Sequence, residues 1–150
     1  MTSLQLYVGL DYHDDSIRVC VMTQEGEVLA NRNRANDVED VAEFIWQYGK
    51  PEGVAIEACC GAADFAAELT RKYEFDVRLA HPGYVRRLKQ SPDKSDADDA
   101  ELLADLLRVN YLPEVWTAPE ETRQIRRLAR YRQNLAVDRK VSSSGTWAVN

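Results

Sequence analysis

The sequence LQLYVGLDYHDDSIRVCVMTQEGEVLANRNR, residues 4–34, shows the alternation of apolar and polar side chains that is typical of β-strands. Apolar residues occupy every second position across 4–10 and 17–22, and 28–34 is a third candidate strand. The intervening segments, 12–16 and 24–26, are rich in turn-forming residues. Three strands with such short connections predict an antiparallel meander.

After residue 35 the chain alternates between helical and strand patterns. We predict a helix that starts at Asn36 and ends at Gly49–Pro51. The further predicted elements are a strand over 53–58, a helix over 62–73, a strand over 76–80, helices over 84–90 and 95–111, a connector over 113–119, a long basic helix over 120–140 and a flexible stretch over 142–145. Antiparallel strands followed by β-α-β alternation predict an α/β fold: a mixed sheet with helices on both faces.

Length and composition narrow the class of protein. With 150 residues, 45% hydrophobic and 29% charged, the chain suits one globular domain. No apolar run reaches the ~18 residues of a membrane span, and the first six residues do not resemble a secretion signal. The three cysteines form no Cys-x-x-Cys pair, which argues against a disulfide framework and against a structural zinc site. This cysteine content favours a reducing compartment, the cytoplasm, as the location of the protein.

The net charge of −6 conceals an uneven distribution. Residues 1–80 carry a net charge of −8, whereas residues 81–150 carry +2. Within the second part, residues 123–140 contain seven basic side chains and one acidic side chain, Asp138. The overall charge therefore does not exclude nucleic acid as a partner.

Two acidic residues follow apolar strands. Asp11 comes just past the end of the first predicted strand, where an Asx turn is the simple alternative to a functional role. Glu57 ends the apolar run Val54–Ile56. Glutamate is rarely buried without a partner, so a strand-end position opening onto a cleft is expected.

The predicted helix over 95–111 contributes two further acids. Helical spacing places Asp96 and Asp99 on one face with Leu103, Leu106 and Asn110, whereas the face with residues 98, 101, 105 and 108 is a solvated one. Acids in a first helical turn can simply favour the macrodipole. The alternative is a divalent cation, because Mg²⁺ and Mn²⁺ prefer oxygen ligands and carboxylates from separate elements form such sites.

Together, Asp11, Glu57, Asp96 and Asp99 suit a site for two metal ions ~4 Å apart that acts at phosphorus. The stretch Val8–Asp11 resembles the opening strand of ribonuclease-H-like folds of the RuvC type, and Ile56–Ala58 followed by Gly61 resembles the second acidic strand of that fold.

A more specific resemblance lies further along the chain. His81-Pro82 and then Lys94-Ser95-Asp96-Ala97-Asp98-Asp99-Ala100 resemble the pattern Pro…Lys-Thr-Asp-x-x-Asp-Ala of the DEDD transposases of the insertion sequence 110 family, which includes the Piv pilin-gene invertase. Ser95 stands where the family usually has Thr. The resemblance covers about residues 4–140.

This resemblance implies an activity and a domain plan. The implied activity is metal-dependent DNA strand cleavage and transfer in transposition or site-specific recombination, with Asp11, Glu57, Asp96 and Asp99 as catalytic metal ligands. A guide (bridge) RNA is an implied partner. The expected organisation is a RuvC-like catalytic domain over 1–112, a connector and basic helix over 113–141 and a tail over 142–150, with the family's C-terminal serine domain absent and recombination incomplete.

Basic side chains supply candidate contacts with nucleic acid. The first group precedes the acidic pair and consists of Arg86, Arg87, Lys89 and Lys94. The second group forms a stripe at helical spacing on the last helix and consists of Arg123, Arg126, Arg127 and Arg130. Instead of binding nucleic acid, the stripe could simply be a solvated face of the helix. The first group could instead cover the edge of the sheet. The last helix is also expected to support self-association. His13 either assists the site or is a turn residue.

Two other functions are alternatives to this one. An actin-like sugar kinase or ATPase shares an opening Gly-x-Asp strand and a following hairpin, but it needs glycine-rich phosphate loops, and the sequence contains no Gly-Gly pair. A non-catalytic module that binds nucleic acid or dimerises through residues 120–140 is the other alternative.

Overall fold

The computed structural model describes residues 3–89, 96–116 and 119–144, with the backbone alone at 96, 120, 123 and 138–144. The chain divides into two units, Met1–Trp116 and Thr117–Asn150. In their described residues, the first unit contains a five-stranded sheet and four helices, and the second contains one helix.

The sheet has the strand order β3-β2-β1-β4-β5. Its strands are β1 (Leu6–Tyr12), β2 (Ser16–Thr23), β3 (Val28–Ala35), β4 (Gly53–Glu57) and β5 (Val77–Ala80). β1, β2 and β3 pair antiparallel, whereas β4 is parallel to β1 and β5 is parallel to β4. The predicted mixed sheet with an antiparallel first half is confirmed.

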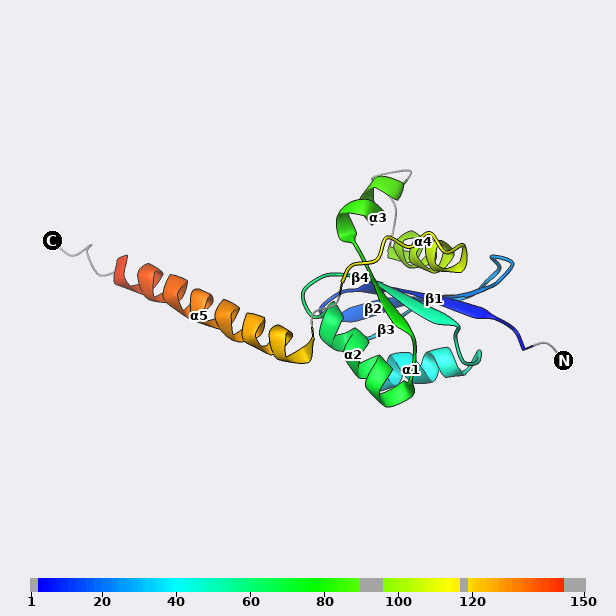
Figure 1. Cartoon of the computed structure of the whole chain (residues 1–150), viewed down its shortest axis with the longest axis horizontal. Coiled ribbons are helices and arrows are strands. Elements are labelled where there is room, and N and C mark those ends of the chain that lie inside the picture. Colours follow the sequence, from blue (N-terminus) through cyan, green and yellow to red (C-terminus); the bar gives the residue numbers. More distant parts are fainter. Residues whose placement is uncertain (1–2, 90–95, 117–118, 145–150) are drawn as a thin grey trace. The chain divides into compact units, whose positions relative to one another are not determined.

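Helices cover both faces of this sheet, as predicted (Figure 1). Those of the first unit are α1 (Val38–Trp46), α2 (Ala62–Tyr73), α3 (Pro82–Leu88) and α4 (Asp96–Arg108). α1 and α2 lie together on one face, and α3 and α4 lie on the other (Figure 1).

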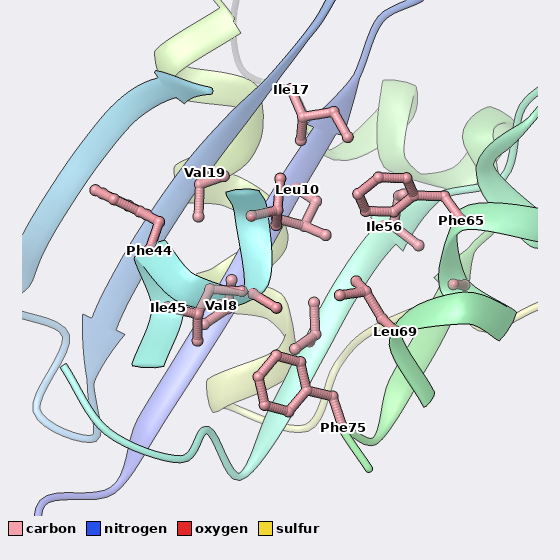
Figure 2. Close-up of a cluster of buried hydrophobic side chains, with 14 of the residues drawn as sticks. Val8, Leu10, Ile17, Val19, Phe44, Ile45, Ile56, Phe65, Leu69 and Phe75 are labelled. Atoms are coloured by element: carbon pink, nitrogen blue, oxygen red, sulfur yellow. The ribbon is translucent and has the colours of Figure 1, made fainter. Parts of the chain in front are cut away.

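The main hydrophobic core lies between the sheet and the α1–α2 layer. Alternate residues of the strands point into it, and Figure 2 shows them meeting aromatic and branched side chains of the helices. The labelled core residues are Val8, Leu10, Ile17, Val19, Phe44, Ile45, Ile56, Phe65, Leu69 and Phe75. Because strand side chains alternate between faces, Gly9, Asp11 and Glu57 belong to the opposite face.

On that opposite face, α4 packs closely against β1 and β2. Its buried residues Ala100 and Ala104 form a cluster with Cys20 and Met22 of β2. A Cβ atom on Gly9 would lie 1.9 Å from the Ala100 carbonyl oxygen, so only glycine permits this approach. The small residues therefore bring the helix backbone down onto the sheet, with Asp99 next to the contact.

Several predicted details differ in the structure. Asp11 lies inside β1, since the ladder with β2 continues to the pair Tyr12 and Ile17. The first helix begins at Val38 rather than Asn36: Asp37 is its cap, and its side chain accepts a hydrogen bond from the Asp40 backbone at 2.9 Å.

The buried side of α4 also differs from the predicted one. Ala100, Leu103, Ala104 and Leu107 are buried, whereas Asn110 is exposed beyond the helix end. The stripe is rotated because Ala100 and Ala104 meet β2, alongside Leu103 and Leu107, which pack with Ala55 and Ala80 of β4 and β5.

The second unit, in its described part, is the single helix α5 (Glu120–Ser144), which extends beyond the predicted end at residue 140. Residues 142–144, expected to be flexible, belong to it. Across residues 3–89, 96–116 and 119–144, no helix combines the length and the apolar character needed to cross a membrane.

Candidate active site

Asp11 and Glu57 lie at the same end of two adjacent parallel strands. In the register of β1 and β4, Leu10 pairs with Ile56, and each acidic residue comes directly after one member of that pair. Both acids belong to the sheet face that α4 covers. The topology therefore brings together two carboxylates that are 46 positions apart in the sequence.

Asp11 is buried in polar surroundings. The Nε2 atom of His13 lies 2.9 Å from Asp11 Oδ2, and because a carboxylate only accepts hydrogen bonds, the ring nitrogen is the donor. Arg18 is the cross-strand partner of Asp11 in the β1–β2 ladder. His13 lies in the connection between β1 and β2, which fits a turn residue, and its hydrogen bond to Asp11 also fits a residue that assists the site.

Asp99 reaches the same region from α4. Its Oδ1 atom lies 2.9 Å from Nζ of Lys89, the residue that follows α3, and both side chains are largely buried. The ammonium approaches outside hydrogen-bond geometry, so Oδ1 is buried without a hydrogen bond from any described residue. A buried carboxylate oxygen left in this way favours a cation as a ligand.

The charges of several of these residues act on the Glu57 carboxyl group. Burial is the main cause that raises the pKa of its carboxyl group, and the negative charges of Asp11 and Asp99 raise it further. Lys89 and Arg86 act in the opposite direction. The three acids therefore share one electrostatic environment in which repulsion is only partly compensated by the basic side chains of α3 and its C-cap.

A hydrogen-bond network outside the acids fixes the start of α4. The Asn31 side chain in β3 donates to the Ala97 carbonyl at 2.9 Å. Arg18 in turn donates to the Asn31 side chain at 2.7 Å and to its carbonyl at 3.0 Å. Arg18 and Asn31 were not among the predicted site residues, although strand alternation and the short hairpin indicate that Arg18 shares a sheet face with Asp11.

The donor chemistry of the acids fits a hard divalent cation such as Mg²⁺ or Mn²⁺, since all available donors are carboxylate oxygens. Among the described side chains, no group of three histidine, cysteine, aspartate or glutamate residues is spaced to hold a metal ion. Asp96, the fourth predicted ligand, is the first residue of α4, and its side chain lies outside the described part of the chain.

The predicted basic residues fall into the two units. Arg86 and Arg87 lie in the last turn of α3 and are exposed, and Lys89 is its C-cap. Lys94 lies outside the described residues. In α5, the side chains of Arg126, Arg127 and Arg130 are exposed, and that of Arg123 is among those the structure does not describe.

Comparison with solved structures identifies the class of fold. RuvC from T. thermophilus, in a structure described as a complex with a Holliday junction substrate, is similar with a TM-score of 0.53 and 14% sequence identity. The similarity covers 74% of this chain and 99% of that RuvC chain. The first unit therefore has the RuvC-type, ribonuclease-H-like fold that the sequence predicted.

Comparison with family models identifies the family. The model of the DEDD transposases of insertion sequence 110, described as a transposase, matches residues 8–143. The chain belongs to this family. The search of curated proteins found no significant match.

Proposed function

We propose that this chain is the metal-dependent DNA cleavage and strand-transfer domain of a transposase or site-specific recombinase. The observation that carries the proposal is that Asp11 and Glu57 end adjacent parallel strands and that the charges of Asp11 and of Asp99, from α4, both act on Glu57. Membership of a transposase family supports the same reaction class.

In this proposal, Asp11, Glu57, Asp96 and Asp99 would hold two Mg²⁺ or Mn²⁺ ions. Such ions supply an activated oxygen nucleophile and stabilise the oxygen that leaves phosphorus. Asn31 and Arg18 hold the first turn of α4, so they position Asp99 relative to Asp11. His13 orients the Asp11 carboxylate through its hydrogen bond.

The basic side chains then bind the DNA backbone. Arg86, Arg87 and Lys89 offer positive charge beside the acidic site, and the exposed arginines of α5 offer it in the second unit. The DNA bound by the related RuvC fold supports DNA as the substrate. The proposal also includes a guide RNA as a partner and self-association through α5. It includes a cytoplasmic location as well, because a reducing compartment suits the three free cysteines.

The test is a nicking assay on supercoiled DNA with Mn²⁺ or Mg²⁺. We expect Asp11→Asn and Asp99→Asn to reduce metal-dependent nicking at least about 100-fold, because each removes a carboxylate charge from the site. Asp105→Asn is the matched control. Asp105 lies in the same helix but away from the site, and its carboxylate forms an ion pair with Arg108 at a distance of 2.6 Å.

The assay also distinguishes the non-catalytic alternative. A purified chain that binds DNA and has no metal-dependent nicking above that of Asp11→Asn would be a binding module, and the proposed activity would be wrong. Nicking that survives both substitutions would overturn the assignment of the site.

A further inference from the structure

The short helix α3 presents three different faces. Val85 is buried in the cluster beneath the helix, with Leu103 and Leu107 of α4. Lys89, at its C-terminal end, is tied to Asp99, and the charge of Arg86 acts on Glu57. The remaining face consists of Tyr84, Arg87 and Leu88, all exposed.

Tyr84 is held in place although 51% of it is exposed. The Arg87 guanidinium lies over its ring, 5.4 Å from the ring centre, and the His81 ring meets it edge to face at 4.9 Å. These contacts restrict the side chain without burying it. An aromatic ring fixed in this way loses little conformational freedom when a flat partner stacks on it.

The charge around Tyr84 indicates which partner the surface fits. Residues 82–89 contain three basic side chains and no acidic one, in a unit whose first 80 residues carry a net charge of −8. An exposed ring beside cations, on the helix whose C-cap Lys89 pairs with Asp99, suits a nucleotide, because the base can stack on the ring and the phosphate can meet the cations. Base pairs within a duplex hide these flat surfaces, so an unpaired base is required.

We propose that Tyr84 is a stacking platform for an unpaired base of the DNA strand whose backbone enters the acidic site. Arg87 supports the ring from one side, and the other cations of α3 contact the flanking phosphates. The proposal rests on the proposed function and extends it, because it states that the substrate is locally unpaired next to the cleaved phosphate.

The experiment uses the full chain, Mg²⁺ and an oligonucleotide carrying the fluorescent base 2-aminopurine, either single-stranded or in a blunt duplex. Stacking on Tyr84 is expected to quench the fluorescence of the single strand. Tyr84→Ala should weaken single-strand binding about tenfold and abolish the quenching, with less than about a twofold effect on the duplex. Tyr84→Trp and Tyr84→Phe should retain the quenching, because the ring and not the hydroxyl makes the contact.

Tyr111→Ala is the matched control, since Tyr111 is exposed just beyond the opposite end of α4. Circular dichroism of each variant confirms that it is folded. Equal quenching by Tyr84→Ala and wild type, or an equal loss of single-strand and duplex binding, would overturn the stacking proposal while metal-dependent nicking stands. A chain that neither binds nor nicks DNA would overturn the proposed function as well.

Discussion

The backbone of Gly9 in β1 lies directly against the backbone of Ala100 in α4, so close that a Cβ atom on Gly9 would be 1.9 Å from the Ala100 carbonyl oxygen. Ala100 follows Asp99, and Gly9 is two residues before Asp11. The distance between the two acids therefore depends on this contact. Glycine is needed at position 9 because it lets α4 approach the sheet closely, and this approach determines where the Asp99 carboxylate lies.

Gly9→Ala is expected to destabilise the first unit by about 3 kcal/mol, because the added methyl group meets backbone atoms that cannot rotate away. It should also impair nicking by moving Asp99. Urea unfolding measures the stability. Gly53→Ala is the control, since its methyl group would meet only the flexible Leu107 side chain, at 3.1 Å, and an equal cost for both variants would contradict this account.

Lys89→Met is expected to strengthen Mn²⁺ binding several-fold, because the ammonium at 2.9 Å from Asp99 Oδ1 competes with a metal ion for the same carboxylate. The same variant should bind DNA more weakly, since it lacks a cation that meets a phosphate. Titration of free Mn²⁺ by electron paramagnetic resonance gives the affinity without any activity assay. Unchanged or weaker Mn²⁺ binding would show that Lys89 does not oppose the ion.

The exposed arginines of α5 are expected to determine much of the salt dependence of DNA binding. Replacing Arg126, Arg127 and Arg130 together with Gln should reduce the slope of log K against log salt by about 3, or about one for each arginine that binds a phosphate. Arg71→Gln with Lys72→Gln is the control, because these side chains pair with Glu68 on α2. An unchanged slope for the triple variant would indicate a solvated face.

The cysteines provide a test of how α4 packs. Burial raises the pKa of Cys20 to about 12, whereas Cys59 and Cys60 are exposed. A thiol reagent at neutral pH should therefore modify two cysteines in the native chain and the third only after unfolding. Modification of all three in the native chain would mean that α4 does not cover β2.

The same shift in the Cys20 pKa makes stability depend on pH. The folded thiol keeps its proton above the ordinary pKa of 9.0, so the unfolded state loses its proton first and the free energy of unfolding falls as the pH rises from about 9 towards about 12. Cys20→Ala should lack this contribution. Urea unfolding at about pH 8 and about pH 10.5 measures the difference.

The sheet was predictable because its strands carry a period of two. The alternation across 4–10 and 17–22 indicated the hairpin, and the apolar run Val54–Ile56 indicated the central parallel strand that ends in Glu57. The end of the first strand was misplaced, because the polar residues Asp11 and Tyr12 still pair with β2.

The rotation of α4 could not be read from apolar periodicity. Beside Leu103 and Leu107, that helix also meets the sheet through Ala100 and Ala104, which are too small to mark a hydrophobic stripe. Their packing depends on Gly9, whose missing side chain admits the helix backbone. The Lys89–Asp99 ion pair was not predictable either, because the sequence pattern favours DNA as the partner of the lysine and a metal ion as the partner of the aspartate.

The central claim is that Asp11, Glu57, Asp96 and Asp99 form one metal site. A crystal structure of the chain soaked in Mn²⁺, with anomalous scattering recorded, tests it most directly. We expect one or two Mn²⁺ peaks bound by these four carboxylates, at ~4 Å from each other if there are two. Strong anomalous peaks only elsewhere, with Lys89 still paired to Asp99, would contradict it.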